Sequence, residues 1–218
     1  MSDQPTFSTE DSIVFVIDMI KDFLEPGEEF VIDAGREMYP KTKELLELAR
    51  AHQVPIVYAA SQGMTNSLFD HFWQPIRDRV SLIPGTDGVQ VVDELAPAQY
   101  SDYEVYVPKC KYSAFHGTKL DVILRNPPFR GRNTIIVTGM ATNYCCMCTT
   151  IDAFNRDYDV VFVDDLNCTF AGADGTSAEE MHRGTVETLK QGYAVAVVSA
   201  DELLAGLRGT RVRESLAV

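Results

Sequence analysis

Short runs of β-branched and aromatic residues recur along the chain and alternate with longer segments of helical character. The runs Ile13 to Ile17 and Val160 to Val163 are apolar throughout, with no alternation of apolar and polar residues. Strands of this kind belong to a sheet that helices cover on both faces, as parallel sheets require. The sequence therefore predicts a doubly wound α/β fold with a six-stranded, mainly parallel sheet flanked by helices.

The predicted elements follow one another in regular order. The six strands are Ser12 to Asp18, Val54 to Ala60, Glu104 to Pro108, Thr134 to Gly139, Asp159 to Asp164 and Ala194 to Ser199. The helices are Pro40 to His52, Thr118 to Arg125, Asn143 to Arg156, Ala178 to Gln191 and Asp201 to Leu207. A chain of 218 residues fits one large domain, and we expect a single domain with its core from about residue 12 to about residue 207.

One connection is much longer than the links that are usual in such folds. The segment Ser61 to Asp102 separates the second and third strands and contains Phe69, Phe72 and Trp73, whereas most such links have about two to six residues. We interpret it as a partial lid or an assembly surface. The polar tail from Gly209 to Val218 is expected to fray or to pack on a neighbouring subunit.

Charge and composition exclude several classes of partner. The chain has 32 acidic and 19 basic residues and a formal net charge of -13, so nucleic acid and anionic membrane surfaces repel it. It has no secretory signal and no run of about 18 apolar residues. Its five cysteines cannot all pair, and we expect a cytoplasmic protein with reduced thiols. Without a Walker loop or a dinucleotide fingerprint, no cofactor is expected.

Three residues or segments lie at the carboxyl ends of predicted strands, where open parallel sheets bind their ligands. They are Asp18 after the first strand, Lys109 after the third, and Met140 to Cys145 after the fourth. If the fold brings these groups together, the ammonium can hold a thiolate and the carboxylate can accept the thiol proton.

The segment from Thr138 to Cys146 is the strongest local signal, an apolar strand followed by a turn and a helix. Thr142 and Asn143 are both good N-cap residues, and the helix is predicted to begin there. In its first turn Cys145 lies at the positive end of the helix dipole, which favours thiolate, and free amides there could hold an oxyanion. The alternative is a buried cysteine that only packs.

Two rival sites use some of the same residues. A Cys145–His116 dyad is the alternative to a carboxylate base, because His116 is the histidine that lies near a predicted strand end. A zinc site made of Cys145, Cys146, Cys148 and a histidine lacks the paired spacing of structural zinc ligands, and no metal is expected.

Three segments in this order resemble the isochorismatase-like cysteine hydrolases, which include nicotinamidases, N-carbamoylsarcosine amidohydrolase, ureidoacrylate amidohydrolase and the isochorismatases. They are Val16 to Leu24, Lys109 to Thr118, and Thr138 to Cys145 with Asp152 to Phe154 after it. The resemblance runs from about Ser12 to Ala200. It implies a hydrolase that acts on a small-molecule substrate and assembles as a homodimer or homotetramer.

The resemblance also implies roles for individual residues. The catalytic triad would be Asp18, Lys109 and Cys145. A cis peptide bond would join Met140 to Ala141, and the amides of Ala141 and Cys145 would form the oxyanion hole. The implied substrate-binding residues are Phe23, Tyr112, Phe115, His116 and Thr142.

Departures from the family pattern bear on the substrate. Nicotinamidases have an Asp-x-His metal motif after the second strand, where this chain has Ala59 to Gly63, which argues against metal and nicotinamide. Isochorismatases often carry glycine at the position of Cys145, so its presence favours C–N cleavage of an amide, ureido or N-carbamoyl substrate through a thioester. The alternatives are vinyl ether hydrolysis with Asp18 as general acid, and a non-catalytic binding protein.

Overall fold

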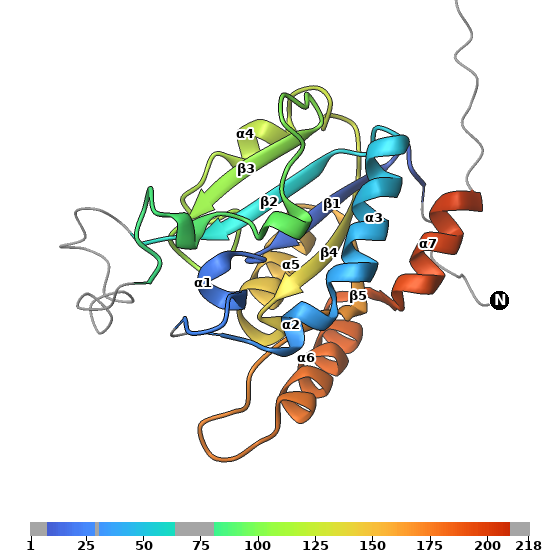
Figure 1. The fold of residues 1–218 in the computed structure, drawn as a ribbon. Helices are drawn as coiled ribbons and strands as arrows, with labels where there is room; N and C mark the ends of the chain where they lie inside the picture. The colour runs from blue at the N-terminus through green and yellow to red at the C-terminus, as the bar shows by residue number, and fades with distance from the viewer. Residues whose placement is uncertain (1–7, 29–30, 64–80, 210–218) are drawn as a thin grey trace, which may run out of the picture.

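The computed structural model describes residues 8–28, 31–63 and 81–209, and its centre is one six-stranded sheet (Figure 1). The strand order is β3-β2-β1-β4-β5-β6, and every neighbouring pair is parallel. The predicted α/β class with a mainly parallel sheet is confirmed. The strands are β1 (Ser12–Ile17), β2 (Ile56–Ser61), β3 (Glu104–Lys109), β4 (Thr134–Met140), β5 (Asp159–Cys168) and β6 (Ala196–Val198).

Helices connect the strands and cover both faces of the sheet (Figure 1). The α-helices are α1 (Lys21–Leu24), α2 (Ala34–Glu37), α3 (Tyr39–Ala51), α4 (Leu120–Leu124), α5 (Met147–Phe154), α6 (Ala178–Tyr193) and α7 (Ala200–Gly209). Among the described residues, the 3-10 turns η2 (Asp87–Val89) and η3 (Asp93–Leu95) precede β3, and a π-helical turn, η4 (Thr142–Cys146), precedes α5. No helix among the described residues is long and apolar enough to cross a membrane.

The continuous apolar runs are explained by two cores, one on each face of the sheet. Side chains of β1 alternate between them: Val14 and Val16 pack with α3 and α7, whereas Ile13 and Phe15 pack with α4, α5 and α6. All six residues of β1 are buried. A strand that contributes to both cores has no face for polar residues, which is why the sequence shows no alternation.

The nucleophile segment and β5 differ from the sequence prediction. The predicted helix Asn143 to Arg156 is split into η4 and a shorter α5. Strand β5 continues to Cys168, and its register against β4 shifts between Val137 and Gly139. The amide of Asn167 donates to two carbonyl oxygens inside this irregularity and holds it in place. A side-chain bond of this kind leaves no periodic trace in a sequence.

Part of the long connection packs on the chain itself. Val91 forms an antiparallel bridge with Ile20, and the carboxylate of Asp22 accepts the N–H of Leu82 at 2.5 Å. This stretch therefore covers the residues that follow β1. Phe69, Phe72, Trp73 and the tail after Gly209, for which a lid, assembly or packing role was predicted, lie outside the described residues.

Candidate active site

The order of the strands reverses between β1 and β4, so the connections after these strands leave on opposite faces and open a site at their carboxyl ends. Asp18 follows β1 directly, with φ at 54°, in the left-handed region that aspartate tolerates better than most residues. Its N–H donates to the carbonyl of Ala59 in β2 at 2.8 Å. This backbone turn ends β1 and holds the carboxylate of Asp18 at the carboxyl ends of the strands.

The Lys109 ammonium contacts side chains that lie at or after the ends of three other strands, β1, β2 and β4. Its Nζ donates to Asp18 Oδ2 at 2.8 Å, to Ser61 Oγ at 2.7 Å and to Cys145 Sγ at 3.1 Å. The other oxygen of Asp18, Oδ1, accepts the N–H of Ser61 at 2.6 Å. Lys109 is 0% exposed and Asp18 is 1% exposed, so this ion pair is fully removed from solvent. The three residues selected by the strand-end rule therefore meet.

The charge state of Cys145 differs from the sequence prediction. Burial of the thiol and the adjacent Asp18 carboxylate raise its pKa to about 12, and the opposing effect of Lys109 is smaller. Burial beside a carboxylate therefore opposes the effect expected of the helix dipole from the sequence. The raised pKa favours the thiol form of Cys145 at rest.

Lys109 stays protonated despite its burial. Burial lowers the pKa of a lysine, but Asp18 and Cys145 outweigh that effect and raise the pKa of Lys109 above its ordinary value. The ammonium is thus a permanent cation at neutral pH. It can neutralise whichever of its two neighbours carries the negative charge.

Glycine is required where β4 approaches β1 beside the site. Gly139 has φ at +121°, and a Cβ atom there would lie 2.0 Å from the carbonyl oxygen of Ile17. The close approach brings the end of β4 against Asp18. The peptide bond between Met140 and Ala141 is cis, as the resemblance implied.

The turn that carries Cys145 is wound more widely than an α-helix. The carbonyl of Ala141 accepts the N–H of Tyr144 at 3.0 Å and that of Cys146 at 3.2 Å. Neither η4 nor α5 has a side-chain N-cap, although the sequence predicted one at Thr142 or Asn143. The hydroxyl of Thr142 instead contacts His182, and Asn143 Oδ1 accepts a hydrogen bond from Thr169 at 2.5 Å.

Three aromatic rings form a row that begins near Cys145. The ring centroids of Tyr112 and Tyr144 are 5.2 Å apart, and Tyr144 stacks on Phe170 at 5.4 Å. Burial and the sulfur of Cys145 raise the pKa of Tyr112, which places its hydroxyl near the thiol. Tyr144 and Phe170 were not predicted as site residues. Phe170 follows β5, at the same carboxyl ends of the strands, and only its position in the fold identifies it as a residue of the site.

The other candidate substrate-binding residues lie in different surroundings. Phe23, on α1, packs against the core beside the end of β1. Phe115 is buried in the core: its ring lies 6.2 Å from that of Phe15 and under the guanidinium of Arg156. Thr142 is completely buried.

His116 is exposed, and within the described residues it forms no hydrogen bond to Cys145. The Cys–His dyad therefore has no support in the geometry. Ser61 is the polar partner that sequence reasoning missed. It ends β2 and so satisfies the same strand-end rule as Asp18 and Lys109. No cluster of potential metal ligands occurs within the described ranges.

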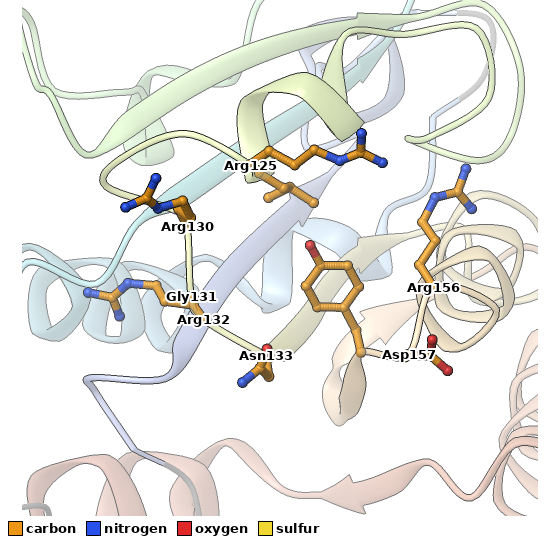
Figure 2. Close-up of a pocket in the computed structure, with 9 residues that line it drawn as sticks. Arg125, Arg130, Gly131, Arg132, Asn133, Arg156 and Asp157 are labelled. Atoms are coloured by element: carbon orange, nitrogen blue, oxygen red, sulfur yellow. The ribbon is translucent and has the colours of Figure 1, made fainter.

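A hollow of about 380 Å³ lies at the amino-terminal ends of the strands, opposite the site, where Asn133 precedes β4 and Tyr158 precedes β5. Figure 2 shows that the guanidinium groups of its four arginines diverge in two pairs. Arg132 and Arg156 already bind structural partners, four backbone carbonyls and Asp121 respectively. The hollow is therefore separate from the chemistry at Cys145. It is lined by Leu124, Arg125, Arg130, Gly131, Arg132, Asn133, Arg156, Asp157 and Tyr158.

The fold and the contacts of Lys109 together define an α/β protein with the arrangement of a cysteine hydrolase. An isochorismatase domain matches residues 12–202. The chain belongs to the isochorismatase-like hydrolase family.

Named relatives share most of the chain. A protein of Arabidopsis thaliana named "probable inactive nicotinamidase" is 27% identical over 181 residues, which cover 81% of this chain and 87% of the relative. A ureidoacrylate amidohydrolase of Agrobacterium fabrum is 28% identical, covering 73% of this chain and 77% of the relative. The crystal structure of a cysteine hydrolase from Pseudomonas syringae pv. phaseolicola is 28% identical, with a TM-score of 0.85, covering 95% of this chain and 99% of that one.

Proposed function

We propose that the protein is a cysteine hydrolase that cleaves the C–N bond of a small linear amide, ureido or N-carbamoyl compound. The observation that carries the proposal is the Lys109 ammonium, which lies between the Asp18 carboxylate and the Cys145 sulfur. These are the groups that a thiol nucleophile needs: an acceptor for its proton and a cation for its anion.

Acylation starts from the neutral thiol. Asp18 accepts the thiol proton as the sulfur of Cys145 attacks the carbonyl carbon, and Lys109 then balances the sulfur as its negative charge develops. The carbonyl oxygen becomes an oxyanion, for which the amides of Ala141 and Cys145 are the proposed donors. When the C–N bond breaks, Asp18 returns the proton to the leaving nitrogen, and the carbonyl stays on the sulfur as a thioester.

Deacylation uses the same groups in reverse. Asp18, again a carboxylate, takes a proton from water as the water oxygen attacks the thioester carbonyl. The C–S bond then breaks, the sulfur takes the proton back from Asp18, and the acid product leaves. The cycle consumes one water and returns each residue to its starting charge.

The amide, ureido and N-carbamoyl classes share one feature, a carbonyl bonded to nitrogen. The Agrobacterium relative is named a ureidoacrylate amidohydrolase, and this name supports the same bond type. An ammonia-release screen over small amides, ureas and carbamoyl amino acids tests the proposal, with Cys145→Ala as the blank. Full activity in Cys145→Ala would refute the thioester route.

Two further candidates are separated by the same variant. Membership of the isochorismatase family favours vinyl ether hydrolysis, in which Asp18 protonates the substrate and Cys145→Ala stays active. The Arabidopsis relative is named a probable inactive nicotinamidase, and the second candidate is accordingly a non-catalytic binding protein. In that case neither the unaltered protein nor Cys145→Ala would turn over any compound in the screen.

A further inference from the structure

A chain of three side chains runs from the nucleophile turn to the surface. Thr142 Oγ1 lies 2.9 Å from His182 Nδ1, and His182 Nε2 lies 3.0 Å from Asp164 Oδ1. Thr142 lies in η4, His182 in α6 and Asp164 in β5. Thr142 is fully buried, whereas the side chain of Asp164 is 52% exposed, so the histidine links a buried hydroxyl to a solvated carboxylate.

The direction of these hydrogen bonds follows from the chemistry of the partners. An ionised aspartate only accepts hydrogen bonds, and a neutral imidazole has one N–H and one lone pair. In its neutral form, His182 therefore donates from Nε2 to Asp164 and accepts at Nδ1 the hydroxyl hydrogen of Thr142. Asp164 fixes the tautomer, and the tautomer fixes where the Thr142 hydroxyl points.

The hydroxyl of Thr142 bonds outside the turn in which it lies and does not cap a helix. Threonine caps a helix from the N-cap position, but Thr142 follows the N-cap residue of η4, Ala141, and no side chain caps η4 or α5. The hydroxyl of Thr142 is turned instead toward α6. Its backbone remains part of the turn: the carbonyl of Thr142 accepts the N–H of Met147. Ala141 directly precedes Thr142, and Cys145 follows three residues later in the same turn.

We propose that His182 is a positioning residue: fixed by Asp164, it holds Thr142 and thereby the turn that carries the amide of Ala141 and the sulfur of Cys145. This inference rests on the proposed function for its kinetic consequence, because misplacement of a nucleophile by a fraction of an ångström slows attack more than it weakens binding. Loss of His182 would leave the buried Thr142 hydroxyl without its partner.

Two substitutions at one position separate the two hydrogen bonds. His182→Asn places an acceptor near the position of Nδ1 and retains the bond to Thr142, whereas His182→Gln reaches the position of Nε2 and retains only the bond to Asp164. We expect kcat to fall about tenfold in His182→Gln with KM little changed, and less than about threefold in His182→Asn. Thr188→Ala is the matched control, since its hydroxyl bonds only within α6.

Equal losses in His182→Asn and His182→Gln, or a loss of the same size in Thr188→Ala, would overturn the proposal. Two measurements need no turnover and so separate its failure from that of the proposed function. Nitrogen-15 NMR of the full-length protein at about pH 8.5, where an ordinary histidine is neutral, should show the Nε2–H tautomer of His182, and the Nδ1–H tautomer would contradict the assignment. The rate of Cys145 alkylation by iodoacetamide should change in His182→Gln and not in His182→Asn; identical rates in both variants would also overturn it.

Discussion

The Lys109 ammonium lies 3.1 Å from the Cys145 sulfur, and both side chains are buried. Cys145 is nevertheless a thiol at rest, because burial and Asp18 raise its pKa to about 12. Lys109 therefore neutralises Asp18 in the resting site. In the proposed mechanism it becomes the counter-ion of the sulfur only after Asp18 has taken the thiol proton, so one cation would serve two successive anions.

Replacing Asp18 with asparagine should make Cys145 more reactive toward an alkylating agent while abolishing turnover. The substitution removes a negative charge that raises the pKa of Cys145, so that pKa falls and more thiolate is present at a given pH. Mass spectrometry after iodoacetamide treatment at about pH 8 measures the rate. In the unaltered protein the rate should still be rising at about pH 10. A plateau near neutral pH there, or slower labelling of Asp18→Asn, would contradict the charge state described above.

Lys109→Met should destabilise the protein and also stop the reaction. It leaves the buried Asp18 carboxylate without its cation, and breaking a buried ion pair in this way costs about 3–5 kcal/mol. The double variant Lys109→Met with Asp18→Asn should recover most of the loss in the free energy of unfolding, measured in urea, because no uncompensated charge remains. It should not recover activity. Additive destabilisation in the double variant would show that the two side chains do not form the pair seen here.

Ser61→Ala should weaken catalysis without preventing folding. The hydroxyl of Ser61 accepts a hydrogen bond from Lys109 at 2.7 Å, and its loss leaves a buried, charged donor with one partner fewer. We expect a loss of stability of about 1–3 kcal/mol and a several-fold fall in kcat. Thr86→Ala removes an exposed hydroxyl that bonds only to Ile83 and is the control. Equal kinetics for the two variants would exclude a role for Ser61 in holding the ammonium.

Two glycine-to-alanine substitutions should have opposite effects on stability. Gly139→Ala places a Cβ atom 2.0 Å from the carbonyl of Ile17 at a positive φ, and should cost more than about 3 kcal/mol or prevent folding. Gly184 lies within α6 with open space around its Cα, so Gly184→Ala should stabilise by about 0.5–1 kcal/mol. Thermal unfolding of both variants gives the comparison. A neutral Gly139→Ala would mean that β1 and β4 lie farther apart than described.

The sequence alone determined the class of fold and the place of the site. Runs such as Ile13 to Ile17 are apolar throughout because each strand feeds two cores, and that pattern is local enough to read directly. The rule that ligands bind at the carboxyl ends of strands then selected Asp18, Lys109 and Cys145. Ser61 meets the same rule, but serine at a strand end is common, and only its contact with Lys109 distinguishes it.

Only the tertiary structure decided the charge on the sulfur and the hydrogen bond of Thr142. Both Thr142 and Cys145 were assigned from the helix that follows them, as a cap and as a thiolate at a dipole. The pKa of Cys145 depends on burial and on charges from strands far apart in the chain. The Thr142 hydroxyl is hydrogen-bonded to His182, 40 residues away. Local sequence specifies which groups are present, whereas the energy of each group depends on neighbours that folding alone supplies.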